Sequence, residues 1–441
     1  MEENQIVESI LNKTFFPAWK NAAWKENKEM ELFKTIEFMV SAHCDQACKY
    51  CYYRKYGKYT YPAAIAKPKL VIENARMILN WLEENEYYPE FNLFSGEIFA
   101  QKAGIEVIKL VSDFHKRTGH VSGCTIPTNM SFLFDEKKTE MVTKLINDGH
   151  EAGFHMHLSA SVDGKYCDVN RPFKDKRIKT DEWYEKFFDF VAEHHVGLHP
   201  MVYSKEIQHW RKNFDWFQEH LAKRNLGWKQ PYLLEVRNEE WTEPELNEFY
   251  KFIQYVVGYG WKKAKEEGVL PHSFPQYCHE NKLFNLMTIF GSVGRGTSCS
   301  IQTTVQIRLG DMKHVLCHRA AYRPHELWKF THADGKITGI EAINTAGFIS
   351  WIAADSKTFP MCECCPINSF CIGQCWGSMF ESNKDHFVPI PSVCALEHIK
   401  LKAVLDTVHK LNLHTYFYDH TNKLQKNYMK MHWQRYKGEN L

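Results

Sequence analysis

Apolar positions between residues 35 and 270 follow two alternating periods along the chain. Short runs of β-branched and aromatic residues predict strands, and longer stretches with helical spacing of apolar residues predict amphipathic helices between them. The predicted strands cover residues 35–40, 91–94, 121–127, 154–162, 196–203 and 232–236. The predicted helices cover residues 70–84, 105–116, 136–147, 182–194, 210–223 and 244–267.

This alternation is typical of an α/β protein in which parallel strands are joined by crossover helices. Six strand-helix units predict a partial (β/α)6 TIM-like barrel, since a closed barrel of this type has eight. In such folds the loops that follow the carboxyl ends of the strands carry the reactive groups. We therefore expect functional residues directly after the predicted strands.

The composition of the chain changes near Gly291, where the run GSVGRGTSCS is followed by closely spaced cysteines. A domain boundary is expected at 270–295, and residues 304–308 and 313–317 around the turn 309–312 predict a β-hairpin. Four parts are expected: a helical N-terminal extension (1–34), the partial barrel (35–270), a small cysteine-rich domain with a hairpin and helices (291–400), and a basic helical tail (401–441).

The 441-residue chain has 14 cysteines and a formal net charge of +2. Its acidic start, MEENQIVESI, lacks the pattern of a secretory signal, and no apolar run approaches the roughly 18 residues of a membrane span. A cytoplasmic protein without a membrane partner is expected, and in a reducing compartment thiols favour metal ligation over disulfides. The near-zero charge gives no general attraction to nucleic acid, and the basic run 423–437 is interpreted as a solvated helix face rather than an RNA contact.

Three cysteines, Cys44, Cys48 and Cys51, stand at C-x3-C-x2-C spacing directly after the first predicted strand. Three thiolates on one loop can hold three irons of a [4Fe–4S] cube and leave the fourth iron open to a substrate or cofactor. The alternative is a zinc site with His43 as fourth ligand, but His43 adjoins Cys44 and the chain would have to fold back on itself. The loop therefore favours a cluster that takes part in chemistry.

A second group of cysteines follows residue 291. Four of them have C-x2-C-x5-C-x3-C spacing, and three more flank this run. Seven thiols are nearly enough for two further clusters, each of which prefers four cysteines, although the first pair also has the spacing of a zinc knuckle. These residues are Cys299, Cys317, Cys362, Cys365, Cys371, Cys375 and Cys394.

Together these motifs resemble those of radical S-adenosylmethionine (radical SAM) enzymes with a C-terminal SPASM domain. The C-x3-C-x2-C loop with Tyr50 before its last cysteine resembles the superfamily signature, and the seven later cysteines with Gly310 resemble the SPASM pattern. The resemblance covers about residues 35–400. It implies a [4Fe–4S] radical SAM cluster, S-adenosylmethionine, two auxiliary Fe–S clusters of the [4Fe–4S] type, and an external one-electron donor of the flavodoxin or ferredoxin type.

Weaker landmarks of the family also follow predicted strands. The run Phe94-Ser95-Gly96-Glu97 resembles the GGE motif that contacts the amino group of S-adenosylmethionine, although Ser95 replaces the first glycine and Ile98 the usual proline. Asn129 resembles the ending of the third strand. Ser161, Asp163 and Arg171 resemble the SxDG…R pattern, in which the serine meets the ribose and the arginine meets the methionine carboxylate. Each landmark taken alone also fits a turn, a loop cap or a surface charge.

The resemblance also implies how the SPASM cysteines divide. One auxiliary cluster would be held by Cys362, Cys365, Cys371 and Cys394, and the other by Cys299, Cys317 and Cys375. The fourth ligand of the second cluster stays open between Cys278, Cys364, a noncysteine side chain and the substrate itself.

Four further residues are candidates for the reaction. His318 stands where relatives that oxidise sulfatase side chains have an aspartate base, and it is either a proton acceptor or a structural histidine. Cys167 is either a hydrogen-atom donor, as peptide epimerases require, or an inert thiol. Glu235 and Arg237 lie at the end of the sixth predicted strand and are candidates for polar substrate contacts.

The resemblance implies reductive cleavage of S-adenosylmethionine to a 5′-deoxyadenosyl radical, which removes hydrogen from a peptide or protein side chain or backbone. Crosslinking, oxidation or epimerisation would follow. The alternatives are a radical SAM dehydrogenase for a small molecule such as an alcohol or sugar, and a zinc protein that binds RNA. Many peptide-modifying relatives have a leader-binding module of roughly 80 residues, whereas 34 precede the first predicted strand here, so a separate leader-binding protein is one expected partner.

Overall fold

The computed structural model describes residues 2–20, 34–226, 231, 233–237, 239–267, 304–321, 325–353, 360–367 and 374–412. The chain forms two compact units that interleave along the sequence. The first unit comprises Met1–Asp163, Asp168–His199 and Cys299–Ala354, and the second comprises Gly164–Cys167, Pro200–Ser298 and Asp355–Leu441. The expected domains at 35–270 and 291–400, and the partial barrel, remain predictions.

The largest sheet of the first unit begins with strand β1 (Thr35–Met39), which is paired in parallel on both sides, with β2 (Glu90–Phe94) and with β8 (Thr304–Arg308). The predicted hairpin is confirmed, because β8 pairs antiparallel with β9 (Lys313–Val315). Strands β10 (Glu326–Ala333) and β11 (Lys336–Ala342), which the sequence did not predict, complete the order β11-β10-β9-β8-β1-β2.

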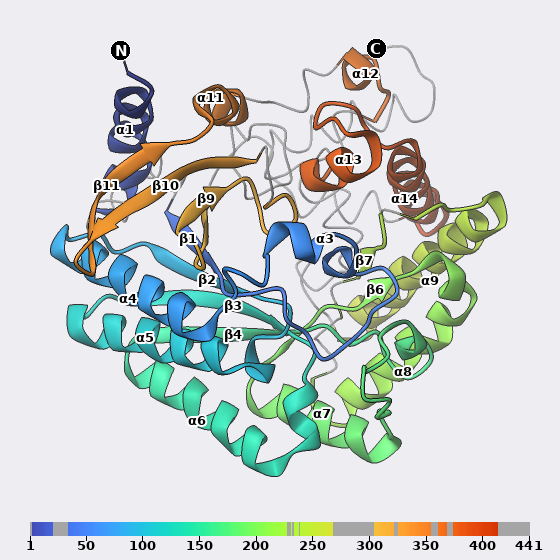
Figure 1. The fold of residues 1–441 in the computed structure, drawn as a ribbon. Helices are drawn as coiled ribbons and strands as arrows, with labels where there is room; N and C mark the ends of the chain where they lie inside the picture. Colours follow the sequence, from blue (N-terminus) through green and yellow to red (C-terminus); the bar gives the residue numbers. More distant parts are fainter. Residues whose placement is uncertain are drawn as a thin grey trace. The chain divides into compact units, whose positions relative to one another are not determined.

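A second sheet of the first unit contains β3 (Ser122–Thr128), β4 (Phe154–Ala160) and β5 (Gly197–Leu198), all parallel. Strand β3 lies beside β2, and the connections run through α4 (Pro68–Glu84), α5 (Lys102–Thr118), α6 (Glu136–Glu151) and α7 (Asp181–Glu193). These helices confirm the predicted ones to within a few residues at each end. Strands β1 to β4 therefore end toward the same side of the unit (Figure 1).

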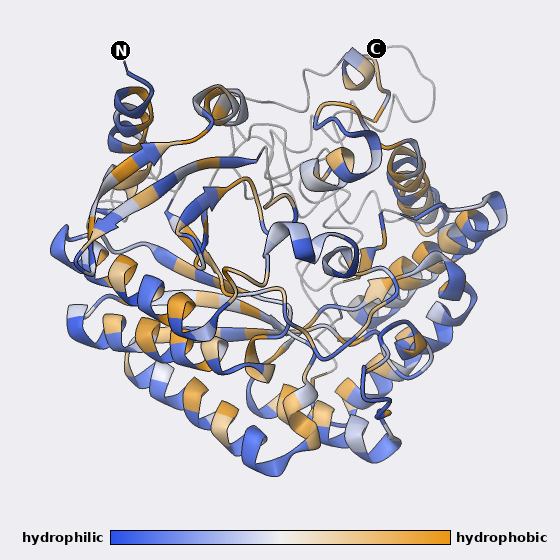
Figure 2. Cartoon of the chain, in the orientation of Figure 1, coloured by the Kyte–Doolittle hydropathy of each residue, from blue (hydrophilic) through white to orange (hydrophobic). Residues whose placement is uncertain are grey.

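Local sequence explains where these helices begin and end. Helix α4 begins with Pro68, whose missing N–H is not needed in the first turn. Helix α5 ends at Gly119, which adopts a left-handed conformation with φ of 67°. The side chains of Asp135 and Thr180 accept hydrogen bonds from the first turns of α6 and α7. Figure 2 shows the resulting pattern, with apolar stripes along α4 to α6 and polar residues on their outer faces.

The expected helical extension at the N-terminus is present over the described residues, as α1 (Glu3–Lys13) and α2 (Phe15–Trp19). Aromatic contacts hold α2 to the first unit: Phe16 stacks on Tyr87 and meets Trp81 edge to face. The backbone N–H of Ala342 on β11 also donates to Asn4 on α1, over 2.8 Å. The extension is therefore packed on the unit.

Short elements complete the first unit. They are the helices α3 (Tyr52–Thr60) and α11 (Thr345–Ala353) and the 3-10 turns η3 (Ile98–Ala100), η4 (Ser131–Phe134) and η5 (Asp168–Asn170). Gly310, the glycine of the SPASM pattern, lies in the turn between β8 and β9. A Cβ there would come within 2.2 Å of the carbonyl oxygen of Ile65, so only glycine fits this close approach.

The second unit is mainly helical over its described residues, with a parallel pair of short strands, β6 (Met201–Val202) and β7 (Leu234–Glu235). Helix α14 (Pro391–Lys410) packs along α9 (Glu243–Glu267) around a core that includes Trp210, Phe252 and Val404. The other elements are η6 (Ser204–His209), α8 (Trp210–Ala222), α9 (Glu243–Glu267), α12 (Pro360–Glu363), α13 (Trp376–Asn383) and α14 (Pro391–Lys410).

Four sequence predictions need correction or restriction. The single strand at 196–203 is wrong: it is two short strands, β5 and β6, on either side of His199 and Pro200, and proline lacks the N–H that a continuous strand needs. The helix expected in 401–441 begins earlier, at Pro391, and ends at Lys410. The basic run 423–437 lies outside the described residues, as does Tyr232 at the start of the sixth predicted strand.

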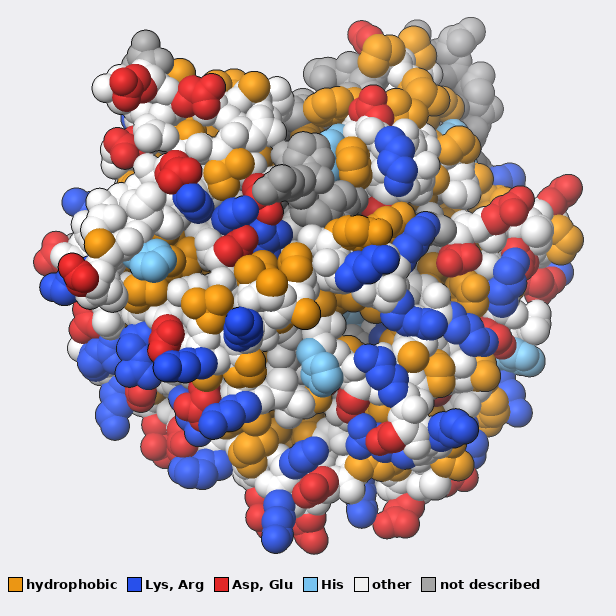
Figure 3. Space-filling view, in the orientation of Figure 1, with side chains coloured by type: hydrophobic (Ala, Val, Ile, Leu, Met, Phe, Trp, Pro, Cys, Tyr) orange, Lys and Arg blue, Asp and Glu red, His pale blue; other side chains and the backbone are white. Residues whose placement is uncertain are grey.

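Within the described ranges, no helix is both long and apolar enough to cross a bilayer. On the face shown in Figure 3, Lys and Arg side chains are interspersed with Asp and Glu side chains. This mixture agrees with the net charge of +2 and gives that face no broad patch of one sign.

Candidate functional site

The cysteine loop, residues 41–51, continues directly from β1 in the first unit. Cys51 is the N-cap of α3, and its backbone N–H donates to the carbonyl oxygen of Cys48 over 3.2 Å. Burial raises the pKa of the Cys44 thiol above its usual range, and it raises that of Cys48 to about 11. The charge of Cys48 raises the pKa of Cys44 further, and the charge of Cys51 raises that of Cys48. The three thiols therefore lie close enough to influence one another electrostatically.

The segment after β2 runs against the backbone of the cysteine loop. Gly96 donates its N–H to the carbonyl of Ser41 over 2.9 Å, and Glu97 donates its N–H to that of His43 over 2.7 Å. A Cβ on Gly96 would lie 2.2 Å from the carbonyl oxygen of His43, so a side chain cannot fit there. The hydroxyl of Ser95 donates to the same carbonyl of Ser41 over 3.0 Å. The predicted residues Ser95, Gly96 and Glu97 therefore support the loop directly.

The carboxylate of Glu97 is buried and links β2 to β3. It accepts hydrogen bonds from the N–H of Phe99 (3.2 Å), the hydroxyl of Thr128 (2.9 Å) and the N–H of Asn129 (2.6 Å). Burial raises its pKa to about 7, although these donors oppose the shift. Both carboxylate oxygens are thus engaged by the protein, and Glu97 fixes the two strand ends in register.

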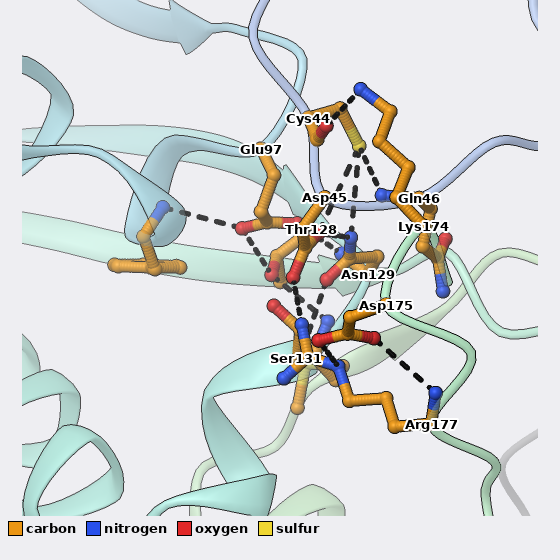
Figure 4. A network of polar contacts seen from close by, with 12 residues as sticks. Cys44, Asp45, Gln46, Glu97, Thr128, Asn129, Ser131, Lys174, Asp175 and Arg177 are labelled. Atoms are coloured by element: carbon orange, nitrogen blue, oxygen red, sulfur yellow. Dashed lines mark hydrogen bonds and ion pairs between the residues drawn. The ribbon is translucent and has the colours of Figure 1, made fainter.

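Asn129, the predicted residue at the end of β3, also turns toward the cysteine loop. Its Nδ2 donates to Asp45 over 2.7 Å and approaches the sulfur of Cys44 at 3.8 Å, while its Oδ1 accepts the N–H of Ser131. Figure 4 shows Asn129 between Cys44, Asp45 and Ser131. The amide of Asn129 thereby orients the first cysteine.

A clamp of residues 170–177, of which the sequence reasoning named only Arg171, covers the other side of the loop (Figure 4). Lys174 donates through Nζ to the carbonyl of Cys44 over 2.6 Å, and Arg177 donates through Nη2 to the carboxylate of Asp45 over 2.6 Å. Backbone hydrogen bonds join Ala47 to Pro172 and Lys49 to Asn170. The signal in the sequence was the charged run KDKR at 174–177, shortly after Arg171, together with an acidic residue inside the cysteine motif.

Asp163 is a fully buried carboxylate at the centre of a second group of predicted residues. The hydroxyl of Tyr50 donates to Oδ2, and Nε of Arg171 donates to Oδ1 over 2.7 Å. The Arg171 guanidinium also lies 5.3 Å from the centroid of the Tyr50 ring. Burial raises the pKa of Tyr50 well above its usual range, so the phenol stays protonated and keeps donating. Ser161 lies just after β4, where its N–H donates to Thr128 over 2.7 Å.

His318 is placed in the first unit beside a residue that the sequence reasoning overlooked, Glu37 on β1. Its Nδ1 lies 2.9 Å from Glu37, and its ring stacks on Phe94 with centroids 3.8 Å apart. The carboxylate makes Nδ1 the protonated nitrogen, which leaves Nε2 as the acceptor of the neutral ring. The signal was a lone acidic residue within the apolar strand TIEFM. The geometry is compatible with a proton acceptor, a role that stays a prediction.

The second unit holds Glu235 and Arg237 in a cluster of four charges. Lys400 lies 3.2 Å from Glu235 and 2.9 Å from Glu397, and it is 3% exposed. Arg237 lies 3.6 Å from Glu397 and 3.9 Å from Glu235. Burial opposes ionisation of Glu397, but Lys400 and Arg237 hold its pKa below the usual range. These pairs connect β7 to α14, and the predicted contact of Glu235 and Arg237 with substrate remains a prediction.

Cys167 is fully buried in the apolar core of the second unit, which also contains Trp210 and Phe214. Its backbone N–H donates to Gly164 over 2.9 Å. This position is that of a packed small side chain, and a hydrogen-donor role for the thiol stays a prediction.

Three of the SPASM cysteines approach one another in the second unit. Burial raises the pKa of Cys394, and the nearby charges of Cys362 and Cys365 raise it further. Cys375 is the N-cap of α13, whereas Cys364 is exposed. Cys317 lies in the first unit, where it is buried and its sulfur accepts the N–H of Ala320. Cys299, Cys371 and Cys278 lie outside the described residues.

The thiols of the cysteine loop are possible ligands for a single metal ion or for an Fe–S cluster. Among the described residues, no three His, Cys, Asp or Glu side chains gather tightly enough to bind one shared ion. A cube needs a wider spread, because each thiolate binds a different iron at its own corner. The loop of Cys44, Cys48 and Cys51 supplies three thiols, which are the donor type that Fe–S clusters use.

No protein-family model and no curated protein sequence matches the chain. Among solved structures, native anSMEcpe with bound AdoMet and Cp18Cys peptide is similar over 86% of this chain and 99% of that one, with 14% identity and a TM-score of 0.54. SuiB from Streptococcus suis, bound to S-adenosylmethionine, is similar over 84% of this chain and 79% of that one, with 12% identity and a TM-score of 0.43. Both of these structures contain bound S-adenosylmethionine (AdoMet). The chain therefore shares the fold of anSMEcpe, and this confirms at the level of the fold the resemblance predicted from the cysteine motifs.

Proposed function

We propose that the protein is a radical SAM enzyme with a SPASM domain that modifies a peptide or protein. It cleaves S-adenosylmethionine reductively and removes hydrogen from a side chain or backbone of the substrate, which leads to crosslinking, oxidation or epimerisation. The observation that carries this proposal is the convergence at the cysteine loop. Residues that follow three different strands meet there, and most match positions of the family motifs: Tyr50, Gly96, Glu97, Asn129, Asp163 and Arg171.

The loop would hold the radical SAM cluster through Cys44, Cys48 and Cys51. When bound, a [4Fe–4S] cluster with one open iron supplies the electron and the binding site for S-adenosylmethionine. The chain's own contribution is orientation. Gly96 lets the segment after β2 approach the loop, Asn129 holds the first cysteine, and the clamp closes the other side.

Arg171 is the candidate for the methionine carboxylate of the cofactor. Asp163 holds its guanidinium through Nε, so the orientation of the cation is set before an anion arrives. Tyr50 fixes the second oxygen of Asp163 and packs against the guanidinium. Ser161 stands nearby in sequence, at the end of β4, as the candidate for the ribose.

A peptide substrate is supported by the fold shared with anSMEcpe, which was solved with a peptide bound. In this protein His318, oriented by Glu37, is the candidate base, and Glu235 and Arg237 are candidates for polar contacts with the substrate. The SPASM cysteines would hold two auxiliary clusters, with an external flavodoxin- or ferredoxin-type protein as electron donor. A separate leader-binding protein is a further proposed partner.

The test is anaerobic reconstitution, followed by incubation with S-adenosylmethionine and a reductant. We expect iron and sulfide at the level of three clusters, and 5′-deoxyadenosine even without substrate. Candidate peptides encoded beside the gene should gain a mass change, whereas a product from an alcohol or sugar alone would favour the small-molecule alternative. Zinc without iron, or iron without 5′-deoxyadenosine, would refute the proposal.

A matched pair of variants separates the loop from the other thiols. Cys48→Ala should abolish 5′-deoxyadenosine, since it removes one of three ligands of the radical SAM cluster. Cys124→Ala is the control, because Cys124 is also a buried thiol, on β3, and belongs to neither cysteine motif. It should retain the activity of the unchanged protein.

A further inference from the structure

Two side chains other than cysteines reach the sulfur atoms of the second unit. Nε2 of Gln374 donates to the sulfur of Cys394 over 3.1 Å, and Nε2 of His398 lies 3.6 Å from the sulfur of Cys365. Both distances lie within the range of hydrogen bonds to sulfur. The thiols of Cys365 and Cys394 therefore each have a nitrogen partner supplied by the surrounding protein.

The orientation of Gln374 is fixed by its other contacts. Its Oε1 accepts the backbone N–H of Ile390 over 2.7 Å, and its Nε2 also donates to the carbonyl of Ile390 over 3.1 Å. A flipped amide would set N–H against N–H and oxygen against oxygen, so the network determines the assignment. Gln374 is also buried, at 5% exposure. Its N–H is thus held permanently toward Cys394.

His398 reaches the site because of its place on α14. It follows Cys394 by four residues, so the two side chains lie on the same face of the helix, one turn apart. A metal-bound thiolate has no proton and can only accept. Nε2 of His398 must therefore be the donor when Cys365 is a ligand. Helix α14 thus supplies both a ligand and a hydrogen-bond donor to the same group of cysteines.

We propose that Gln374 and His398 tune the auxiliary cluster held by Cys362, Cys365 and Cys394, raising its reduction potential. This inference rests on the proposed function. Reduction adds one electron to the cluster, and N–H groups directed at its thiolates stabilise the added negative charge. A raised reduction potential makes this cluster a better electron acceptor than an otherwise identical cluster without such donors. It suits acceptance of the electron that a substrate radical loses when it is oxidised, rather than delivery of an electron to S-adenosylmethionine.

The experiment measures the potential of this cluster in isolation from the radical SAM cluster. A background variant with Cys44, Cys48 and Cys51 replaced by alanine keeps the auxiliary cysteines. Redox titration at constant pH, followed by electron paramagnetic resonance, gives the potentials of the remaining clusters. The signal that disappears in an added Cys394→Ala variant belongs to the cluster in question.

On this background we expect His398→Phe and Gln374→Leu each to shift that potential to more negative values, and the double variant to shift it further. His398→Gln, which retains an N–H donor, should recover part of the shift. His409→Gln, also on α14, is the matched control and should leave the potential unchanged. Because Gln374→Leu also loses the bonds to Ile390, the His398 variants decide the outcome if the leucine variant fails to retain iron.

The possible failures are distinguishable. An unchanged potential in His398→Phe with full iron content would overturn the inference and leave the proposed function intact. A shift that His398→Gln does not reduce at all would also overturn it, since a structural effect would then explain the change. A background variant that binds no iron would instead refute the proposed function, and the inference would fall with it.

Discussion

The two cysteine regions of this protein are built differently. The loop of Cys44, Cys48 and Cys51 is held by the segment after β2, by Asn129 after β3 and by the clamp 170–177, through many hydrogen bonds to its backbone and side chains. Over the described residues, the group of Cys362, Cys365 and Cys394 shows fewer such supports, chiefly Gln374 and His398. Within the described residues, the protein's own hydrogen bonds organise the loop of Cys44, Cys48 and Cys51 more extensively than the second group.

The regions also share one device. Cys51 and Cys375 are both helix N-caps, of α3 and α13, with nearly the same backbone angles: φ of −71° and −69°, and ψ of 117° in both. The positive end of a helix stabilises a thiolate. A predicted ligand of the radical SAM cluster and a predicted ligand of an auxiliary cluster therefore both lie at a helix N-cap.

The largest expected effect separates the chemical roles of the two regions. Cys48→Ala should abolish cleavage of S-adenosylmethionine altogether, whereas Cys394→Ala should retain 5′-deoxyadenosine formation and lose the modified peptide. The reason is that, in the proposed function, S-adenosylmethionine binds to the cluster of the first region alone. Quantifying 5′-deoxyadenosine and peptide product in parallel tests this, and a Cys394→Ala protein that cleaves no S-adenosylmethionine would break the distinction.

A second prediction concerns the buried pair that is expected to bind the cofactor. Asp163→Asn leaves Arg171 without its carboxylate, and breaking a buried ion pair costs roughly 3–5 kcal/mol of unfolding free energy. We also expect a raised KM for S-adenosylmethionine. Urea unfolding and kinetics measure both effects.

The control for this prediction is Glu182→Gln, which breaks an exposed pair with Lys186 at 3.3 Å. Such surface pairs contribute about 0–1 kcal/mol. Equal losses of stability in the two variants would contradict the role assigned to Asp163.

A third prediction tests whether the clamp organises the loop. Arg177→Gln removes the ion pair with Asp45, and loss of such an outer partner weakens metal retention by about 10–100-fold. The rate of iron loss to a chelator from the radical SAM cluster measures this effect. Lys144→Gln, which breaks an exposed pair with Asp148, serves as control and should release iron at the unchanged rate.

The smallest predicted effect is a pH dependence confined to the first unit. Burial between Trp328 and Phe348 lowers the pKa of His314 to about 3. In the unfolded chain the pKa of His314 is about 6.5, so between pH 6.5 and the folded pKa the unfolded state binds a proton that the folded state does not. The contribution of His314 to the free energy of unfolding is therefore fully present above pH 6.5 and decreases as the pH falls. The loss is about 1.4 kcal/mol per pH unit, or about 2 kcal/mol at pH 5.

His314→Phe should remove this part of the acid sensitivity and keep the aromatic packing. Urea unfolding at pH 7.5 and pH 5 gives the comparison. A phenylalanine variant with the same pH dependence as the unchanged protein would show that His314 does not titrate in this way.

Much of the loop could be predicted from sequence because its motif residues directly follow strands. The helical and strand periods located β1 to β4, and parallel pairing then carries Ser95, Asn129 and Ser161 to one side of the unit. The cysteine spacing supplied the chemistry. Position after a strand is a local property, which is why the sequence reveals it.

The clamp and Glu37 could not be predicted, because their roles depend on distant parts of the chain. Lys174 and Arg177 follow β4 by more than ten residues, and nothing local indicates that this segment returns to Cys44. Glu37 is the lone acidic residue of the strand TIEFM, and a carboxylate is usually exposed to solvent. It is buried because β2 and β8 flank β1 and His318 pairs with it.

Local sequence patterns also did not predict that the two units are built from alternating segments of the chain. Strand β8 lies far along the chain from β1, yet the two pair in parallel over five residues. The break at Pro200 was available in the sequence, since proline interrupts strands, but the apolar run around it outweighed this signal.

The most direct test of the account is whether the loop of Cys44, Cys48 and Cys51 binds S-adenosylmethionine at an open iron. In a variant with Cys362 and Cys394 replaced by alanine, the reduced protein should show a [4Fe–4S] electron paramagnetic resonance signal that changes when S-adenosylmethionine is added. A further Cys48→Ala change should remove that signal. A spectrum that S-adenosylmethionine leaves unchanged, or a loop that takes up no iron, would contradict the account.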